Sequence, residues 1–591
     1  MAVLHISDSS CNHTIEPDLF GFNMEVTRQT FWHGLSAQML ANRKFFAAKD
    51  DIPCAWTMAG DVRWQQESEK ACFIFDGNGA INQICQDTFL QAGECCQISF
   101  LMEIQGDFEV TVALNEKYHC RCSVSSSGQA EEFLLRLKAE TDLSDPVFCL
   151  KVQGFGQLKL YAVSMLPDDH YFGMRRDVLE KLRTLAPSAL RFPGGCYAEC
   201  YPWKNGFLPP NRRPVIHTDL YQGDFLLRNT FLQDCFEMNV DEFICLCDYV
   251  GAKPELTLPL IRQPMQDAID LVEYCRGGSD TEWGALRIQR GHPEPFPVKE
   301  WYIGNEVYYF GGKLAEDGNL AAEKTIQMAE QIKKIDPECR LVLGFCPHDP
   351  EWSCAYLSKA GYLADKLSIH FYQTTEMDKN YQKVTDEMRS RVLEDFFIPE
   401  LDCAKKLAEE IGCGHIPFSL DEWGYNWGEP GSPESMLVDS LLMAFLENHA
   451  KERNIEKALY FHPVNEGMIS VNSRTAEWDY FGAAFQMFSA LRGKQKLEIT
   501  GQDLLYTVAG KTDRNRIGVI LVACHRQDDS TVRFESDLFV PSSVVCLFQI
   551  IPDGTSYHIS KTERSAGDTF TIHAGAVAFA EIITEDDRIT Y

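Results

Sequence analysis

Between about residues 168 and 490, short apolar stretches alternate with stretches of helical periodicity such as 176–185, 319–334 and 399–411. The apolar stretches predict strands at 189–192, 254–259, 298–304, 341–345, 367–372, 418–422 and 458–462. Strand–helix alternation over this length predicts an α/β fold, a (β/α)8 TIM barrel, with helices outside a parallel sheet. A doubly wound sheet would alternate similarly, but neither common Gly-rich phosphate loop is present.

The regions that flank this alternation have a different sequence pattern. Residues 54–167 contain short strand-like stretches separated by Gly, Asn and Asp, and residues 491–591 return to the same pattern. Short alternating strands with frequent turn residues predict β-sandwiches, one inserted and one C-terminal. Within the preceding segment, residues 34–43 have the pattern of a helix.

Composition limits the partners and the compartment. The chain has 55 Lys and Arg against 86 Asp and Glu, a net charge of −31, which disfavours nucleic acid or a membrane as a partner. No apolar stretch approaches the ~20 residues that span a bilayer, and the N-terminus lacks a signal-peptide pattern. The 22 cysteines are scattered without the spacing of common zinc sites. We therefore expect a cytoplasmic protein with no metal and no cofactor.

Two glutamates stand at the ends of predicted strands beside an aromatic residue. Glu306 closes the run Trp-Tyr-Ile-Gly-Asn-Glu, and Glu422 lies in Phe-Ser-Leu-Asp-Glu-Trp. One such glutamate is usually a solvated loop residue, but the carboxyl ends of barrel strands meet at one face, so two predict one site. Paired carboxylates are the minimal equipment for breaking a glycosidic bond. We predict that Glu306 and Glu422 are catalytic.

An ordered set of motifs resembles the α-L-arabinofuranosidases of glycoside hydrolase family 51. The motifs are Arg191–Cys196 with Trp203-Lys204, Arg213-Pro214, Trp283-Gly284, Gly291–Phe296, Ile303–Glu306 and Asp421–Trp423. The resemblance covers about residues 17–490 and implies a retaining enzyme with catalytic residues on barrel strands 4 and 7. It also implies a homo-oligomer. The domains it implies are a strand at 1–16 joining the C-terminal sandwich at 491–591, a barrel at 17–53 and 168–490, and a carbohydrate-binding-like insert at 54–167.

The motif positions imply roles for individual residues. Glu306 is similar to the family's acid/base and Glu422 to its nucleophile. Asn305 is similar to the asparagine that hydrogen-bonds the 2-hydroxyl of the reacting sugar, and Glu25 to a glutamate that binds sugar hydroxyls. The remaining substrate-binding residues that we expect are Arg191, Cys196, Tyr372, Trp423, Trp427 and His462.

Alternative interpretations apply to several of these residues. Arg191 would also serve as a structural ion-pair partner beneath the barrel mouth, and Cys196 as a packed small hydrophobe. His370 is interpreted as a core histidine in preference to a catalytic one. Trp32, Trp423 and Trp427 are interpreted either as core residues or as platforms for a ligand ring. Because the nucleophile must be ionised while the acid holds a proton, we expect hydrogen bonds, for example from Tyr372, to keep Glu422 charged.

The expected substrate is less constrained than the chemistry. Two stretches, 26–34 and 460–467, depart from the family pattern. The resemblance implies that these stretches help to line the subsite of the reacting sugar. We predict exo-acting release of a terminal non-reducing furanose, with α-L-arabinofuranose first, from oligosaccharides or glycosides. A β-D-galactofuranoside, β-D-apioside or β-D-xyloside substrate, or endo-β-glucanase action, is an alternative. So is a non-catalytic carbohydrate-binding scaffold.

Overall fold

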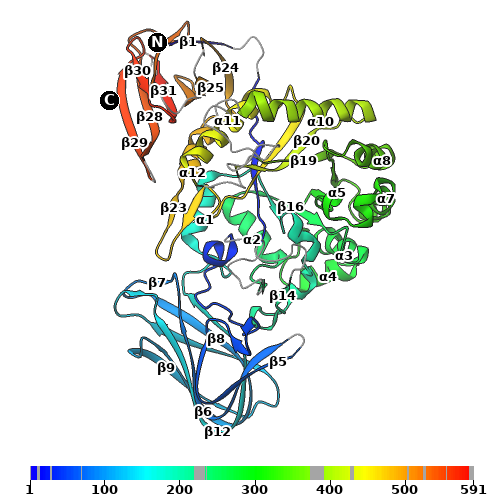
Figure 1. The fold of residues 1–591 in the computed structure, drawn as a ribbon, viewed down its shortest axis with the longest axis vertical. Helices are drawn as coiled ribbons and strands as arrows, with labels where there is room; N and C mark the ends of the chain where they lie inside the picture. Colours follow the sequence, from blue (N-terminus) through cyan, green and yellow to red (C-terminus); the bar gives the residue numbers. More distant parts are fainter. Residues whose placement is uncertain are drawn as a thin grey trace.

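The protein has three parts along its long axis, with a barrel between two β-rich regions (Figure 1). The structure, a computed structural model, describes residues 2–8, 13–26, 30–67, 70–217, 233–234, 236–372, 392–425, 431–501, 505–523, 528–553 and 556–584. None of the helices in these ranges is long and apolar enough to cross a lipid bilayer.

The central part is a closed barrel of eight parallel strands, in the order β13-β16-β17-β18-β19-β20-β21-β2. This confirms the predicted (β/α)8 barrel. Seven of its strands overlap the seven apolar stretches predicted as strands. The strands are β2 (Phe20–Asn23), β13 (Ala189–Phe192), β16 (Lys253–Leu258), β17 (Glu300–Ile303), β18 (Arg340–Gly344), β19 (Lys366–Tyr372), β20 (Phe418–Gly424) and β21 (Ile455–Phe461).

Amphipathic helices surround these strands. In α1 (Arg176–Leu185), buried Val178, Leu182 and Leu185 recur three or four residues apart and face the barrel. A capping box formed by Asn239 and Glu242 starts α2 (Val240–Val250). The other long helices are α3 (Met265–Arg276), α4 (Glu282–Gln289), α7 (Gly318–Ile335), α8 (Pro350–Ala360), α10 (Ile398–Ile411), α11 (Pro433–His449) and α12 (Tyr480–Ser489).

Short elements decorate the barrel and its loops. Helical turns are η1 (Phe31–Leu35), η2 (Cys196–Cys200), η3 (Trp203–Phe207), η4 (Pro210–Arg212), α5 (Val307–Phe310), α6 (Lys313–Glu316), η6 (Gly361–Leu363) and η7 (Leu393–Phe397). Two-stranded pairs are β3 (Ala48–Lys49) with β4 (Ile52–Pro53), β14 (Ile216–His217) with β15 (Gln233–Asp234), and β22 (Ile469–Val471) with β23 (Ala476–Trp478).

A polar network fills the barrel interior below its mouth. The Tyr302 hydroxyl donates to Glu255 Oε2 at 2.8 Å, and Lys457 pairs with the other oxygen of Glu255. Lys366 donates to Glu300 Oε2 at 2.8 Å. These groups come from four different strands, so their pairing cross-links the barrel as well as satisfying buried charges. The Arg191 guanidinium lies 4.5 Å above the Tyr302 ring, at the boundary between this network and the candidate site.

The inserted region is an antiparallel sheet of long strands around a separate hydrophobic core. Inward residues such as Val110, Val112 and Phe148 alternate with more exposed ones, as expected for strands with one buried face. Its strands are β5 (Thr57–Gln66), β6 (Ala71–Ile84), β8 (Cys95–Leu114), β9 (Tyr118–Ser125), β10 (Glu131–Lys138) and β12 (Val147–Pro167), with β7 (Phe89–Leu90) pairing β11 (Leu143–Ser144).

The C-terminal region is a nine-stranded sheet that includes the first strand of the chain. Strand β1 (Ala2–Asp8) lies between β24 and β27, antiparallel to the former and parallel to the latter. The remaining strands are β24 (Gln495–Thr500), β25 (Leu505–Asp513), β26 (Arg516–Ala523), β27 (Ser530–Ser536), β28 (Val544–Asp553), β29 (Ser556–Ser565), β30 (Phe570–Ile572) and β31 (Val577–Ile583).

The helix predicted at 34–43 is wrong. Only η1 (Phe31–Leu35) is helical there, and the chain then runs irregularly between barrel and insert. The Gln83 side chain, from the insert, bonds both the N–H of Ala41 at 2.8 Å and its carbonyl at 2.9 Å. Arg43 is buried and donates to Glu237 at 2.7 Å. Backbone groups that a helix would pair internally are thus satisfied across the boundary between the two parts.

Candidate active site

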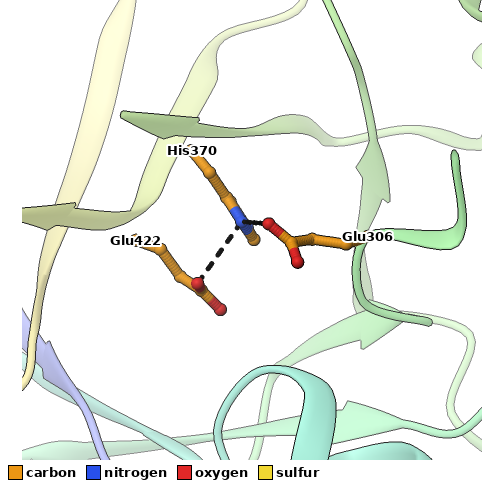
Figure 2. Close-up of side chains that lie close together, drawn as sticks. All are labelled: Glu306, His370 and Glu422. Carbon is orange, nitrogen blue, oxygen red and sulfur yellow. Dashed lines mark hydrogen bonds and ion pairs between the residues drawn. The ribbon is translucent and has the colours of Figure 1, made fainter. Parts of the chain in front are cut away.

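Three side chains converge at the carboxyl end of the barrel (Figure 2). Glu306 follows β17, His370 lies in β19 and Glu422 in β20. His370 Nδ1 is 2.9 Å from Glu306 Oε1 and 3.4 Å from Glu422 Oε2. One carboxylate oxygen from each glutamate and one His370 ring nitrogen all lie within 4.8 Å of one another. The two glutamates predicted to be catalytic therefore face the same space.

Local backbone geometry aims both glutamates at that space. Glu306 has a left-handed backbone, with φ at 44°, which turns the chain from β17 directly into α5. Such a conformation costs a non-glycine residue roughly 1–2 kcal/mol, so the surrounding contacts must hold it. In β20 the register shifts: Leu420 pairs with Ile369 and Glu422 with His370, which leaves Asp421 between them without a partner on β19. This bulge points consecutive acidic residues toward the site.

Glu422 is buried and accepts hydrogen bonds from three side chains. The Tyr372 hydroxyl donates to Oε2 at 2.5 Å, and Arg191 donates to Oε1 at 3.1 Å. Asn23 Nδ2 donates to the same Oε1 at 3.3 Å. Burial raises the pKa of Glu422; His370, Arg191 and Tyr372 oppose this, Glu306 adds to it, and the net direction is upward. The donors are those that an ionised carboxylate needs in a dry site.

His370 is a site residue, which corrects its interpretation as a core histidine. Its ring is surrounded by Glu306, Glu422 and Asp421, the last at 3.6 Å from Nε2. Burial lowers the pKa of His370, but the nearby carboxylates outweigh burial and raise it well above the ordinary histidine value. The carboxylates around the imidazole thus favour its protonated form over its neutral form.

Arg191 joins the two halves of the site. It is fully buried at the end of β13, donates to Glu422 Oε1, and donates from its other terminal nitrogen to Asn305 Oδ1 at 2.8 Å. Asp421 Oδ2 lies 3.7 Å from the same nitrogen. Arg191 is thus both an ion-pair partner and the group that orients the asparagine next to Glu306.

The glycine pair after β13 allows close approach of the backbone to the site. A Cβ on Gly195 would lie 2.2 Å from Glu422 Oε1, and one on Gly194, whose φ is 100°, would lie 2.3 Å from the Cβ of Glu25. Any side chain at either position would displace a site carboxylate. Glu25 itself is buried, and its Oε1 accepts from the N–H of Tyr197 at 2.6 Å.

Cys196 contacts both residues of the Asn-Glu pair that follows β17. Its Sγ is 3.5 Å from Glu306 Oε2 and accepts from Asn305 Nδ2 at 3.2 Å. Three residues on, Glu199 is fully buried and accepts backbone N–H groups of Leu260, Ile261 and Arg262. The segment after the glycine pair therefore fixes the loop after β16 and also borders Glu306.

Two predicted binding residues do not join the cluster. Trp423 is fully buried on the opposite face of β20, where it packs against Tyr460 and Phe481 at ring distances of 5.2 and 6.3 Å. This burial favours the core interpretation of Trp423 over a sugar contact, because the residue after Glu422 in a strand points to the opposite face. His462 is also fully buried, with Nδ1 2.7 Å from the Thr30 hydroxyl. Trp427 lies outside the described residues.

Sequence reasoning missed Asn23, His370 and Asp421. Asn23 ends β2 in the way that Asn305 follows β17, and this position at a strand end was the available signal. Asp421 lies close to His370 because of the bulge in β20, which the sequence pattern does not predict. Among the described side chains, Glu306, His370 and Glu422 also have the spacing of a metal-binding group. In this structure, the same atoms are joined by hydrogen bonds and ion pairs.

Comparisons of sequence point to one family. A family model described as the alpha-L-arabinofuranosidase 1 domain matches residues 181–390. The chain is 29% identical over 268 residues to an intracellular exo-alpha-(1->5)-L-arabinofuranosidase of Halalkalibacterium halodurans, covering 44% of this chain and 50% of that protein. It is 33% identical over 214 residues to alpha-L-arabinofuranosidase C of Emericella nidulans, covering 34% of this chain and 40% of that protein. The matches span half or less of these relatives.

Comparisons of structure cover more of the chain. An arabinose-bound α-L-arabinofuranosidase of glycoside hydrolase family 51 aligns over 99% of this chain and 100% of that one, with a TM-score of 0.77 at 16% identity. The Thermotoga maritima α-L-arabinofuranosidase, in an arabinose complex, aligns over 70% of this chain and 90% of that one, with a TM-score of 0.59 at 20% identity. At these identities the likeness shows the fold.

The barrel and its paired carboxylates define a glycoside-hydrolase-like chain. More particularly, the chain is similar to α-L-arabinofuranosidases, in sequence over part of its length and in fold to members of glycoside hydrolase family 51, which confirms the resemblance inferred from the motifs.

Proposed function

We propose that this chain is a retaining exo-glycoside hydrolase that releases a terminal non-reducing α-L-arabinofuranose from oligosaccharides or glycosides. The observation that carries the retaining mechanism is the separation of the two glutamates, whose nearest ligand oxygens lie within 4.8 Å. Retaining pairs stand ~5–5.5 Å apart and inverting pairs ~6.5–9.5 Å, because an inverting enzyme must admit water between base and sugar. The spacing therefore supports direct attack by a carboxylate.

The proposed reaction has two steps. In the first, Glu422 attacks the anomeric carbon while Glu306 gives its proton to the departing glycosidic oxygen, which leaves a glycosyl ester on Glu422. In the second, Glu306, now ionised, takes a proton from a water molecule as that water attacks the same carbon. The ester bond breaks, Glu422 regains its charge, and the sugar leaves with its original anomeric configuration.

The charges around the site support these roles. Arg191 and His370 both lie close to Glu422 and Asp421, and each favours the ionised form of Glu422 despite its burial. The His370 nitrogen at 2.9 Å from Glu306 is suited to stabilise that carboxylate after it gives up its proton. Arg191 orients Asn305, whose proposed role is to bind the 2-hydroxyl of the reacting sugar, with Glu25 on other hydroxyls.

Arabinose is proposed as the released sugar because both relatives described above are named arabinofuranosidases. A panel of aryl glycosides tests it: α-L-arabinofuranoside, β-D-galactofuranoside, β-D-apioside, β-D-xyloside and β-D-glucoside. We expect the arabinofuranoside to have the highest kcat/KM, and proton NMR of the first-formed sugar to show retention. Turnover of β-glucan chains alone would replace the proposal by endo-glucanase action. Sugar binding without turnover of any glycoside would favour a binding scaffold.

Two alanine variants separate the roles of the glutamates. Glu306→Ala should keep turnover of substrates with a good aryl leaving group, which need little protonation, and azide should restore rate with a glycosyl azide of retained configuration. Glu422→Ala should be nearly inactive on every substrate, and azide rescue should give the inverted azide. Exchange of these two behaviours between the variants would reverse the assignment.

We also propose that the protein acts in the cytoplasm as a homo-oligomer. The relative from Halalkalibacterium halodurans is named intracellular, which supports the first part. Cell fractionation with immunoblotting tests the location. Light scattering coupled to size-exclusion chromatography tests the assembly, and a mass of one chain at all concentrations would exclude self-association.

A further inference from the structure

A cavity of about 1430 Å³ lies where the insert meets the barrel. The loop after β2 supplies Trp32 and His33, the insert supplies Asn82 and Gln86, and the β22–β23 hairpin supplies Ser473. In Figure 1 the hairpin extends from the barrel toward the insert near β7. The cavity is therefore composite, since neither the barrel nor the insert forms it alone.

Specific contacts hold the cavity walls in place. The Gln83 side chain bonds both backbone groups of Ala41, which fixes the barrel segment to the insert. On the other side, the guanidinium of Arg474, in the hairpin, lies 4.2 Å above the Phe89 ring of the insert. Asn465 Nδ2 donates to the carbonyl of His33 at 3.0 Å. A cavity held this way is formed before any ligand arrives, which lowers the cost of binding.

The cavity lies beside the barrel mouth. Thr30 is two residues before Trp32, and its hydroxyl is 2.7 Å from Nδ1 of His462, which directly follows β21. The wall formed by Trp32 and His33 thus begins at the carboxyl end of the barrel, the same end that holds Glu306 and Glu422. A chain leaving the candidate site on this side would meet the cavity.

The lining chemistry favours a neutral, hydroxyl-rich ligand. Amides and a hydroxyl from Asn82, Gln86 and Ser473 offer both donors and acceptors, and Trp32 offers an aromatic face. The charged lining side chains are two acids and two bases, Asp50, Asp87, Lys49 and Arg175, so no excess positive charge selects phosphate. The volume exceeds the ~300–1,000 Å³ of sites for single small molecules, which suits an oligomer.

We propose that this cavity binds the neutral oligosaccharide that carries the terminal furanose, and so selects oligosaccharides over small glycosides. The inference rests on the proposed glycosidase function and adds a second binding region, shared between insert and barrel, to the carboxylate site. Its ligand is the part of the substrate on the leaving-group side of the scissile bond.

The test compares two substrates in the full-length protein. In Asn82→Ala/Gln86→Ala, kcat/KM for a linear arabino-oligosaccharide should fall about 10-fold or more through KM, at roughly one lost hydrogen bond per side chain. The same variant should hydrolyse an aryl α-L-arabinofuranoside like the wild type. Ser473→Trp, which fills the cavity, should show the same split. Gln105→Ala, an exposed glutamine of the same sheet outside the cavity, is the matched control.

Each outcome decides the proposal. Equal loss on both substrates would mean that the variants disturb the barrel, and no loss on the oligosaccharide would mean that the cavity is unused; either overturns it. If the wild type hydrolyses neither substrate, the proposed function fails, and calorimetry still tests the cavity. Binding of the oligosaccharide to Glu422→Gln that the added Asn82→Ala/Gln86→Ala pair abolishes would support the cavity, and undiminished binding would refute it.

Discussion

Replacing Tyr372 by phenylalanine should move the acidic limb of the pH–rate profile to higher pH. The Tyr372 hydroxyl lies 2.5 Å from Glu422 Oε2 and lowers the pKa of that carboxyl, which burial otherwise raises. Glu422 must be ionised to attack, so activity falls as pH drops through its pKa. Removing a donor to the ionised form raises that pKa, and the limb must follow it upward.

The hydrogen bond sets the size of the effect. A bond to a charged group contributes about 1.5–3 kcal/mol, and one pKa unit corresponds to about 1.36 kcal/mol, so the limb should shift by about 1–2 pH units. The ring, which meets Phe461 edge-on at a centroid distance of 5.9 Å, is kept by the substitution. Losses at the plateau should therefore be smaller than losses on the acidic side.

The assay is kcat/KM for an aryl α-L-arabinofuranoside between about pH 3 and 9, because this ratio reports groups of the free enzyme. Tyr356→Phe is the matched control: it removes a buried hydroxyl that lies 3.0 Å from Thr325, outside the site. A uniform fall at every pH, with the limb unmoved, would refute the reasoning and assign Tyr372 to substrate binding. A shift to lower pH would contradict the sign.

Two further substitutions test buried carboxylates. Glu199→Gln should lower the unfolding free energy by about 1.5–3 kcal/mol, because an amide cannot replace the acceptor of three backbone N–H groups, and it should lower kcat by loosening the loop beside Asn305. Urea denaturation and aryl-glycoside kinetics check both effects, and unchanged kcat would limit Glu199 to stability. Burial raises the pKa of Glu447 to about 8 against opposition from Arg492 and Lys496. The contribution of Glu447 to the free energy of unfolding is complete below ~4.3, its pKa in the unfolded state, and is lost as the pH rises through about 8. The unfolding free energy of the wild type should therefore decline by up to a few kcal/mol across that window. Glu447→Gln should lack this decline, and parallel curves in urea denaturation would contradict it.

The barrel and its two glutamates were predictable because local pattern encodes them. The short apolar runs at 301–303 and 418–420 each lead to an acidic side chain near the carboxyl end of a strand, and parallel strands bring such ends to one face. The motif at 191–196, which begins within β13, likewise located Arg191 and Cys196. These features depend on residues adjacent in sequence, so they can be predicted without knowledge of tertiary contacts.

The errors have a different origin. The place of His370 among three carboxylates does not follow from its local sequence, because those carboxylates come from other strands. Trp423 lies in the core because strand alternation turns it away from the candidate site. The bulge at Asp421 and the irregular path through Ala41 are set by partners more than forty residues away or on another strand. Composition and periodicity contain no information about such distant partners.

The position of β1 bears on how the protein is made. Its residues pair with Thr500 and Val532, while β2 closes the barrel against β21. A ribosome adding ~5–20 residues per second needs about 20–90 s to reach β21 from the start of the chain. The insert has its own core and can fold meanwhile, and β2 can pair with β13 before β21 is made, whereas β1 has no partner strand until β24. A nascent chain stalled before residue 455 would thus leave β1 unpaired and the β21 edge of β2 open, making these the segments for which chaperone protection during synthesis matters most.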